Sequence, residues 1–158
     1  MKDMDNLYTK NAEGADLPAL NTVIETAVMN WPMEERSKRL AVPVLQYDAV
    51  DMQYYKFHVT VFKEEIVGVA VWDPESTAPL PNGEGRLFHG LFVLPLVQCQ
   101  GVGGRLMEKV FEEAKQHSVN GLLIKAQRVS RGYFSHQGLP ALAVSEGDFP
   151  WQFWKKLA

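Results

Sequence analysis

Apolar residues in the middle of the chain follow the two-residue period of β-strands. From Tyr55 to Val61 they alternate with polar residues, which predicts a half-buried strand. The next segment, Ile66 to Trp72, is almost entirely apolar and predicts a partner strand after a turn at residues 63–65. Two more apolar segments, Leu87 to Leu94 and Leu122 to Ala126, predict further buried strands.

Two other segments have the three- and four-residue spacing of amphipathic helices. The first begins after Asp16, which suits an N-cap, has Pro18 in its first turn, and is stopped by Pro32. The second runs from Val102 to about His117, with an apolar stripe on one side and charged residues on the other. These two helices are the strongest helical predictions in the sequence.

The remaining segments predict shorter elements. We expect a strand at Leu7 to Thr9, a charged helix at Met33 to Leu40, a helix at Ser130 to Gln137 closed by Gly138, and last strands at Leu142 to Val144 and Phe149 to Phe153. Pro43 to Asp51 has no clear period, and Asp73 to Gly85 is rich in Gly and Pro, so we interpret both as loops. Together these elements predict one α+β domain over residues 1–158.

A glycine-rich turn separates the strand at residues 87–94 from the helix that begins at Val102. The first N–H groups of a helix have no partner within it, and the helix dipole makes that end positive. Such a turn binds phosphate-like anions through its backbone, which predicts a phosphorylated cofactor. The residues expected to form this site are Gln98, Cys99, Gln100, Gly101, Val102, Gly103 and Gly104.

Two familiar phosphate loops do not fit this spacing. A Walker-type loop requires Gly-Lys-Ser/Thr, whereas Gly104 is followed by Arg105 and Leu106. A dinucleotide fingerprint requires a third glycine three residues after the second, and Leu106 stands there. Both types of loop are therefore excluded on their chemistry.

The spacing that does fit is Gln-x-x-Gly-x-Gly, from Gln98 to Gly103. With this motif the chain resembles the GNAT acyltransferase superfamily, in particular its small bacterial-type members. That family places Gln/Arg-x-x-Gly-x-Gly/Ala between a strand ending in Val-x-Pro, here Val93 to Pro95, and a long helix. Downstream, the segment Tyr133 to Leu139 resembles the family's aromatic pair followed by Gly-Phe. The resemblance covers roughly residues 54 to 140.

The resemblance implies a fold, a cosubstrate and a set of contacts. The fold is a mixed, mostly antiparallel sheet of about six to seven strands flanked by about four helices, with a splayed strand before the phosphate turn. Acetyl-CoA is the implied cosubstrate, with its diphosphate on the turn, where a Cβ at Gly101 or Gly103 would keep the backbone away. Backbone groups of Phe92 and Val93 would face the thioester, and one N–H is the implied oxyanion donor. Gln127 corresponds to a family position whose side-chain amide contacts the pantetheine arm or orients the next helix. The alternative is that Gln127 only caps the start of that helix.

Two residues are candidates for proton transfer. His89 stands where some family members carry a proton-shuttling histidine, although a histidine held by packing alone is an equal alternative. His58 lies on the polar face of its strand and is expected to be exposed. The family's tyrosine that acts as general acid corresponds to Phe134 here. Tyr133 stands one residue earlier, which is a rotation of about 100° around a helix. Tyr133 is thus either the general acid or a structural aromatic.

Composition limits the remaining choices. The 158-residue chain has a net charge of −3 and no basic run of the kind that binds nucleic acid. No apolar stretch is long enough to span a bilayer, and the acidic first residues lack the apolar core of a signal peptide. The single cysteine, Cys99, excludes an internal disulfide and agrees with a cytoplasmic location. No cluster has metal-ligand spacing, so we expect no metal.

The acceptor is less clearly specified than the cofactor. We expect a small-molecule or peptide amine, and the carboxylates of the charged helix, Asp48 and Asp51 are candidates for attracting a cationic one or are simply solvated. Aromatic residues that would line an acceptor pocket or belong to the core are Trp31, Tyr47, Tyr54, Trp72 and Trp151. The aromatic tail at 151–154 suggests an edge strand or a homodimer contact.

Three functions follow from these residues. The first is an N-acetyltransferase in which an amine attacks acetyl-CoA directly in a ternary complex. The second is a non-catalytic acyl-CoA-binding or sensing module, in which Phe134 marks a lost general acid. The third is a nucleotide-binding protein of another kind, which ATP or NAD rather than coenzyme A would stabilise.

Overall fold

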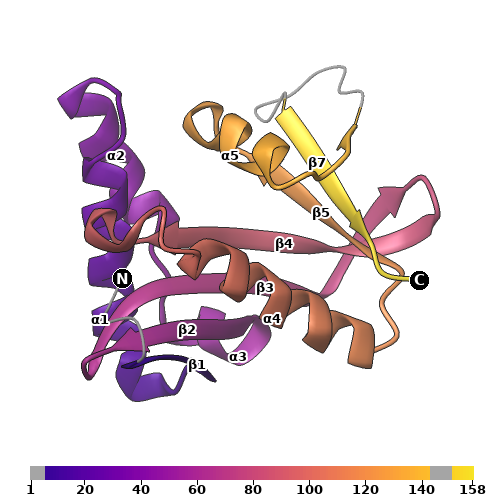
Figure 1. Ribbon diagram of the computed structural model, residues 1–158, viewed down its shortest axis with the longest axis horizontal. Coiled ribbons are helices and arrows are strands. Elements are labelled where there is room, and N and C mark those ends of the chain that lie inside the picture. The colour runs from indigo at the N-terminus through magenta and orange to yellow at the C-terminus, as the bar shows by residue number, and fades with distance from the viewer. Residues whose placement is uncertain (1–5, 143–150) are drawn as a thin grey trace. The chain divides into compact units, whose positions relative to one another are not determined.

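The computed structural model describes residues 6–142 and 151–158, which form a mixed sheet flanked by helices (Figure 1). The strands are β1 (Leu7–Asn11), β2 (Lys56–Phe62), β3 (Glu65–Leu80), β4 (Gly83–Val93), β5 (Gly121–Ala126), β6 (Ala141–Leu142) and β7 (Trp151–Lys156). Their order in the seven-stranded sheet is β1-β2-β3-β4-β5-β7-β6, with β4 and β5 parallel. The pairs β1–β2, β5–β7 and β6–β7 are antiparallel. The predicted fold class is confirmed.

Five α-helices and three short 3-10 helices are found in the described residues. The α-helices are α1 (Leu17–Met29), α2 (Glu35–Leu45), α3 (Ala49–Tyr54), α4 (Val102–Gln116) and α5 (Arg131–His136). The 3-10 helices are η2 (Gly14–Asp16), η3 (Pro95–Val97) and η4 (Arg128–Ser130). Among these described helices, none is long and apolar enough to cross a membrane.

Packing divides the chain into two compact units. Unit 1 comprises residues up to Val71 together with Gly90–Val110, and unit 2 comprises Trp72–His89 and Phe111–Ala158. Strands β3 and β4 and helix α4 pass from one unit into the other. The expectation of a single domain stays a prediction, and each unit is described by itself below.

The core of unit 1 forms where α1 packs on the sheet. Its buried residues include Leu20, Val23, Ile24, Ala27, Val28, Phe57, Val59, Val61, Val69 and Val71. Helix α4 packs closely on β3 at Gly68, because a Cβ there would lie 2.9 Å from Leu106 Cδ1 and 3.0 Å from Val102 Cγ1. Figure 1 shows α4 running along β3. Gly68 thus lets the first turns of α4 approach the sheet.

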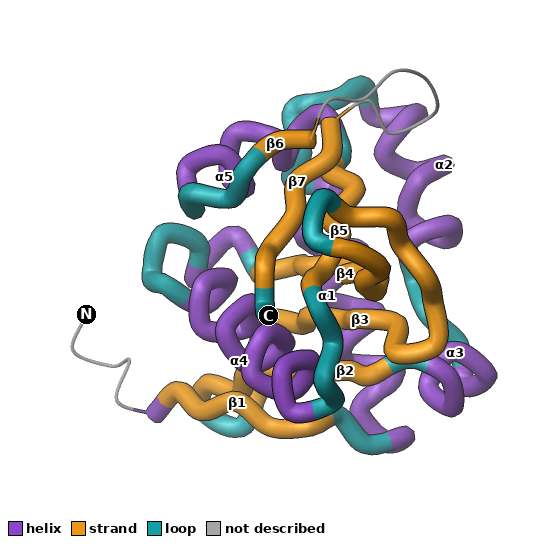
Figure 2. Tube along the Cα trace, turned by 90° about the vertical axis from the view of Figure 1, so that its right-hand side faces the viewer, coloured by secondary structure: helices purple, strands orange, loops and turns teal. Residues whose placement is uncertain are grey.

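The core of unit 2 is built on β5 and β7, which Figure 2 shows side by side with β6 beyond β7. Trp72 is fully buried, and its indole N–H donates to Glu113 of α4 at 2.6 Å. Phe88 of β4 contacts Phe111 of α4, with ring centroids 6.4 Å apart. Since β7 pairs on both sides, the aromatic tail is an interior strand, and its interpretation as an edge strand is wrong.

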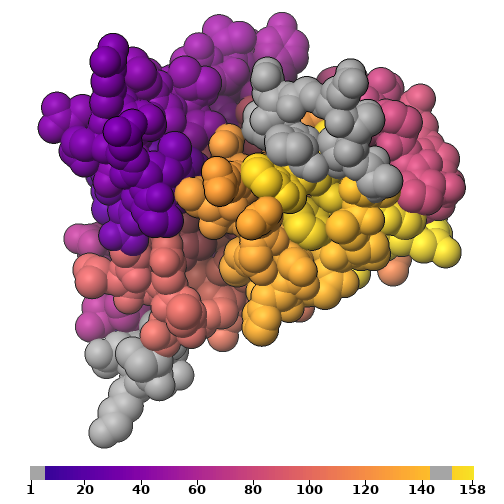
Figure 3. Space-filling view, turned by 90° about the horizontal axis from the view of Figure 1, so that it is seen from above, coloured from indigo at the N-terminus to yellow at the C-terminus, as the bar shows by residue number. Residues whose placement is uncertain are grey.

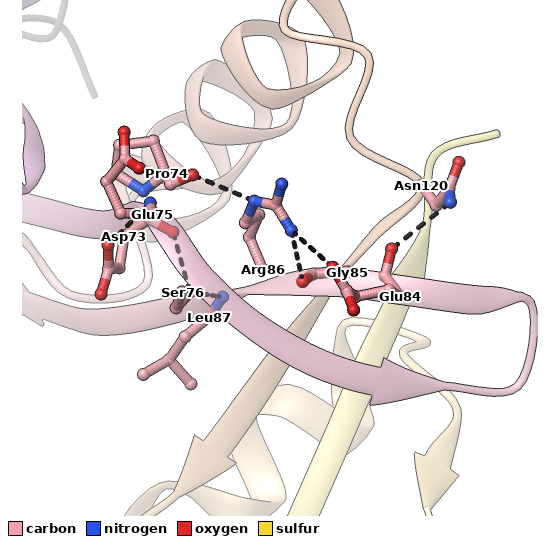
Figure 4. Close-up of polar contacts among 9 residues, drawn as sticks. All are labelled: Asp73, Pro74, Glu75, Ser76, Glu84, Gly85, Arg86, Leu87 and Asn120. Atoms are coloured by element: carbon pink, nitrogen blue, oxygen red, sulfur yellow. Dashed lines mark hydrogen bonds and ion pairs between the residues drawn. The ribbon is translucent and has the colours of Figure 1, made fainter.

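The segment Asp73–Gly85, expected to be a loop, belongs to the long hairpin of β3 and β4. Polar contacts tie its strands together (Figure 4): the Leu87 N–H donates to Ser76 Oγ at 2.8 Å, and Arg86 Nε donates to the Pro74 carbonyl at 3.0 Å. Near the hairpin tip, Asn120 Nδ2 donates to the Glu84 carbonyl at 3.3 Å. Cross-strand contacts therefore overrode the local Gly and Pro signals.

The second predicted loop is also wrong, because α2 continues to Leu45 and α3 begins at Ala49. Pro43 lies in the last turn of α2 and is exposed. The helix continues past it to Leu45, so the proline does not end the helix at the preceding residue. Helix α3 starts with a capping box, in which the Asp51 N–H donates to Asp48 Oδ1 and the Asp48 N–H donates to Asp51 Oδ2, both at 2.9 Å. Asp48 was thus a cap that the sequence analysis did not recognise.

His58 is buried, contrary to expectation, with 6% of its surface exposed. It lies on β2, an interior strand between β1 and β3, and is paired with Asn11 of β1. The other predicted elements are present with shifted ends. Of the two predicted last strands, residues 143, 144, 149 and 150 lie outside the described residues.

Candidate functional site

The parallel pairing of β4 with β5 is a feature of unit 2. The register joins Arg86 to Leu122, Leu87 to Leu123, and Phe88 to Ile124, whereas β4 itself continues to Val93. In unit 1, the Leu94 N–H donates to the Val67 carbonyl at 2.9 Å, which ties the residue after β4 to β3. The splaying of β4 before the turn stays a prediction.

The turn between η3 and α4 presents a series of backbone N–H groups. The bond from the Arg105 N–H to the Gly101 carbonyl, at 3.1 Å, lies at the start of α4, and the first N–H groups of a helix have no partner within it. The backbone has positive φ at Cys99 (65°) and Gly101 (81°). Nothing lies within 4 Å of a Cβ built on Gly101, so its backbone conformation, not crowding by the protein, favours glycine there.

The side chain of Gln98 ties this turn to the strand before it. Its Nε2 donates to the Val93 carbonyl at 3.3 Å, and its N–H donates to the Pro95 carbonyl at 3.3 Å. Gln98 thereby links the last residue of β4 to the start of the turn. Of the predicted cofactor residues, the structure brings together Phe92, Val93 and residues 98–104, all in unit 1.

The electrostatics of the turn suit an anion. The first turn of α4 contains no acidic residue, and its N-terminus carries the positive end of the helix dipole. Arg105 is exposed on the helix surface. Over the described residues, no group of His, Cys, Asp and Glu side chains is arranged to hold a metal ion. The N-terminus of α4 therefore suits a phosphate-like anion.

The predicted base and acid both belong to unit 2. His89 is exposed and stands on β4 one residue after the last pair of the β5 register. Tyr133, on α5, is 37% exposed, and its ring contacts Phe134 edge-on at 5.4 Å between centroids. Desolvation raises the pKa of the Tyr133 phenol above its ordinary value. Tyr133 therefore holds its proton at neutral pH.

Phe134, at the position of the family's tyrosine, is a core residue of unit 2. It is 6% exposed, and its ring lies 6.0 Å from that of Phe153 of β7. Gln127 precedes η4, where its carbonyl accepts from Ser130 N–H at 2.9 Å and from Ser130 Oγ at 3.1 Å. The Gln127 side chain makes no capping hydrogen bond, so the capping alternative applies to its backbone alone.

A polar clamp that the sequence did not reveal fixes Tyr47 in unit 1. Asn21 of α1 donates from Nδ2 to the Tyr47 carbonyl at 2.7 Å and accepts the Tyr47 N–H at 2.9 Å. The Tyr47 ring is 7% exposed, and burial raises the pKa of its phenol. A Cβ on Gly90 of β4 would lie only 2.8 Å from Tyr47 Oη. A glycine within a strand pattern was the one available signal of this close approach.

Comparison with known proteins identifies the family. The model of the acetyltransferase (GNAT) domain family matches residues 25–146. The chain belongs to the GNAT acetyltransferase family. Among curated proteins, none matches this GNAT sequence.

Solved GNAT structures share the fold at low sequence identity. PaiA N-acetyltransferase from Thermoplasma acidophilum, in complex with coenzyme A, is 13% identical with a TM-score of 0.73, covering 95% of this chain and 98% of its own. A GNAT acetyltransferase from Brucella melitensis, in complex with acetyl-CoA, is 15% identical with a TM-score of 0.68, covering 96% and 88%. A third, from Staphylococcus aureus Mu50, is 14% identical with a TM-score of 0.69, covering 96% and 99%. At these identities the similarity establishes the fold.

Proposed function

We propose that this GNAT protein transfers an acetyl group from acetyl-CoA to a primary amine by direct attack in a ternary complex. The observation that carries the proposal is the glycine-rich turn at residues 98–104, which leads into the N-terminus of α4, where the first N–H groups have no partner within the helix. This N-terminus carries the positive end of the helix dipole, and the turn follows the end of β4 after the short η3. Coenzyme A and acetyl-CoA are bound in the solved relatives from T. acidophilum and B. melitensis.

In this proposal the backbone of β4 positions the thioester. The pantetheine arm lies along residues 89–93 as an additional strand, and an N–H at Phe92 or Val93 donates to the carbonyl oxygen as negative charge develops on it. The amine nitrogen forms a bond to the carbonyl carbon, and the carbon–sulfur bond breaks. The sulfur leaves as a thiolate of ordinary pKa about 8.5, which is a tolerable leaving group even without full protonation.

Two side chains manage protons in the proposed reaction. His89 accepts the proton that the attacking amine must lose, since an imidazole titrates near neutrality. Tyr133 donates a proton to the departing sulfur, and its raised pKa keeps the phenol protonated for this role. The Gln127 side chain is proposed to contact the pantetheine arm.

A titration followed by an assay tests the proposal. Calorimetry should detect binding of coenzyme A and acetyl-CoA, and thermal unfolding should shift upward with coenzyme A but not with ATP or NAD. Thiol release from acetyl-CoA is then measured across a panel of primary amines. The absence of heat with coenzyme A would contradict the cofactor assignment.

A non-catalytic acyl-CoA-binding module is the second candidate. The observation that favours it is Phe134, which is buried against Phe153 and has no hydroxyl to donate. The module predicts tight binding of acetyl-CoA with no thiol release above background for any amine. The same amine panel therefore separates the two candidates.

Two further expectations are kept as proposals. We infer a cytoplasmic location, because Cys99 is an exposed free thiol and such thiols suit a reducing compartment. A homodimer is proposed with no nucleic-acid or membrane partner, and light scattering of the purified protein tests its oligomeric state.

A further inference from the structure

An aromatic cluster of Trp31, Tyr47 and Phe92 adjoins the end of β4 in unit 1. The rings of Trp31, which follows α1, and Phe92 of β4 are stacked with centroids 6.5 Å apart and planes 20° from parallel. Phe92 is buried, whereas Trp31 is only half-buried and keeps part of its ring accessible. Phe92 immediately precedes Val93, so this pair stands beside the segment that the proposed function assigns to the thioester.

Tyr47, which is buried, continues this aromatic cluster along β4. A Cβ on Gly90 would lie 2.8 Å from Tyr47 Oη and 3.0 Å from Phe92 Cε2, so both rings approach the same side of the strand. The Asn21 clamp fixes the backbone of Tyr47, and burial keeps its phenol uncharged. Tyr47 and Phe92 thus approach Gly90, and Trp31, stacked on Phe92, is the partly accessible member of this uncharged cluster.

Most carboxylates that would attract a cationic amine are already engaged. Asp48 and Asp51 cap α3 reciprocally. Glu35 pairs with Lys38 at 3.4 Å and with Arg39 at 3.4 Å. Lys38 also donates to the Met29 carbonyl at 2.9 Å, so this ion pair lies at the end of α1, two residues before Trp31. Carboxylates that are already paired or capping give little support to an acceptor with several positive charges.

We propose that the acceptor is a primary amine attached to an aromatic or broad apolar group, which stacks on the accessible part of Trp31, and that polyamines are poor acceptors. This inference rests on the proposed acetyltransferase function, because it requires the amine to reach a thioester beside Phe92. Residues of α1 and α2 form part of the molecular surface, in indigo and purple in Figure 3. Trp31 is the specificity-determining residue in this proposal.

Steady-state kinetics with 2-phenylethylamine and spermidine at saturating acetyl-CoA test the proposal. The wild-type kcat/KM should be at least about tenfold higher for phenylethylamine, and Trp31→Ala should raise its KM about tenfold, in keeping with aromatic stacking plus lost apolar contact. The same substitution should alter the KM for spermidine and for acetyl-CoA much less. Trp31→Phe keeps an aromatic ring and should stay within about threefold of wild type.

Tyr8→Ala is the matched control, because Tyr8 is an aromatic residue of the same unit that is 56% exposed on β1 and has no proposed role in the site. It should leave both amine KM values unchanged. Equal or better use of spermidine, or a Trp31→Ala effect of equal size on both amines, overturns the inference while the acetyltransferase function stands. Thermal unfolding of Trp31→Ala and Trp31→Phe verifies that each variant is folded.

If the protein acetylates no amine in the panel, the proposed function is contradicted. A separate measurement then tests the aromatic site. Calorimetric titration of phenylethylamine into the protein saturated with coenzyme A then reports on the aromatic site directly. Binding that Trp31→Ala weakens about tenfold supports the site in the absence of turnover. No binding, or binding that is insensitive to Trp31, overturns it.

Discussion

The turn at residues 98–104 and helix α5 differ in the groups that they contribute to the proposed reaction: the turn contributes its backbone, and α5 contributes a side chain. In the turn the proposed ligand contacts are backbone N–H groups, so Cys99 and Gln100 can occupy it without changing its donors. At α5 the proposed role belongs to one hydroxyl, and the family's tyrosine position holds the buried Phe134. A backbone site depends on conformation and tolerates most side chains, whereas a side-chain site is lost with a single atom. The following predictions test that difference.

The largest effect is expected at the proposed base. His89→Ala should lower kcat about 100-fold, since positioned general bases contribute at least that much, and should remove the acidic limb of the pH–rate profile. The KM for acetyl-CoA should change little because the turn is untouched. Rates unchanged across pH would show that His89 is a structural histidine.

In the turn, charge should matter more than side-chain size. Gly101 has φ of 81° and open space around a built Cβ, and both Asn and Asp tolerate this conformation. Gly101→Asp should weaken coenzyme A binding about 30-fold through repulsion of the diphosphate, whereas Gly101→Asn should weaken it about threefold. Calorimetry measures both. Equal affinities of the two variants would argue against an anion at this position.

The corresponding test at α5 removes one oxygen. Tyr133→Phe should lower kcat about tenfold, because a thiolate leaves with moderate ease even without the donated proton. Tyr8→Phe, which removes the hydroxyl of an exposed tyrosine in unit 1, is the control. Since desolvation raises the pKa of Tyr133, wild-type activity should show no alkaline loss from this group below pH of about 10. An unaltered kcat in Tyr133→Phe assigns Tyr133 a structural role.

Glycine-to-alanine changes in β3, on which the first turns of α4 pack, and in α5 should have opposite effects on stability. Gly68→Ala should destabilise the protein by about 1–3 kcal/mol, because its Cβ would meet Leu106 at 2.9 Å and push α4 from β3. Gly132→Ala in α5 should stabilise it by about 0.5–1 kcal/mol, because nothing lies within 4 Å and alanine favours helix. Denaturant unfolding measures both changes. A destabilising Gly132→Ala would mean that α5 needs the glycine.

The smallest effect is expected at an ion pair distant from both sites in the sequence. The Glu13 N–H donates to Asp16 at 2.8 Å and Lys10 lies 3.2 Å away, which together lower the pKa of the Asp16 carboxyl. Its stabilisation is present above the unfolded pKa of about 3.9 and is lost as the pH falls through the lowered folded value. Asp16→Asn should cost less than about 1 kcal/mol at pH 7. The difference from wild type should shrink as the pH falls below the unfolded pKa of about 3.9 and should disappear below the lowered folded pKa; a pH-independent difference would refute the linkage.

The parts of the fold that were predicted correctly have repeating local patterns. The alternation predicted the strand β2 and the four-residue stripe predicted the helix α4, because each pattern recurs over several pairs or turns. The expectation that β2 is half-buried was wrong, since residues 57–61 are all buried. The turn at 98–104 was likewise recognised because it needs a strand, glycines and a helix in immediate succession. Gln98, Gly101 and Gly103 lie where the motif placed them.

The errors arose where distant contacts decided the conformation. The hairpin of β3 and β4 forms through Gly- and Pro-rich sequence because Ser76 and Arg86 bond across it. The region after Pro43 is helical and ordered around Tyr47 because Asn21, 26 residues earlier, clamps the Tyr47 backbone. Local propensity carries no information about such partners.

The sequence by itself determined the glycine-rich turn, its flanking strand and helix, and the family, because these depend on residues that are consecutive in the chain. Tertiary structure alone decided that Phe134 is core, that His58 is buried, and that Trp31 and Tyr47 meet β4 near Gly90. Those outcomes depend on which distant side chains fill the space around each residue, and hydrophobic packing is not directional enough for a local pattern to specify its partners.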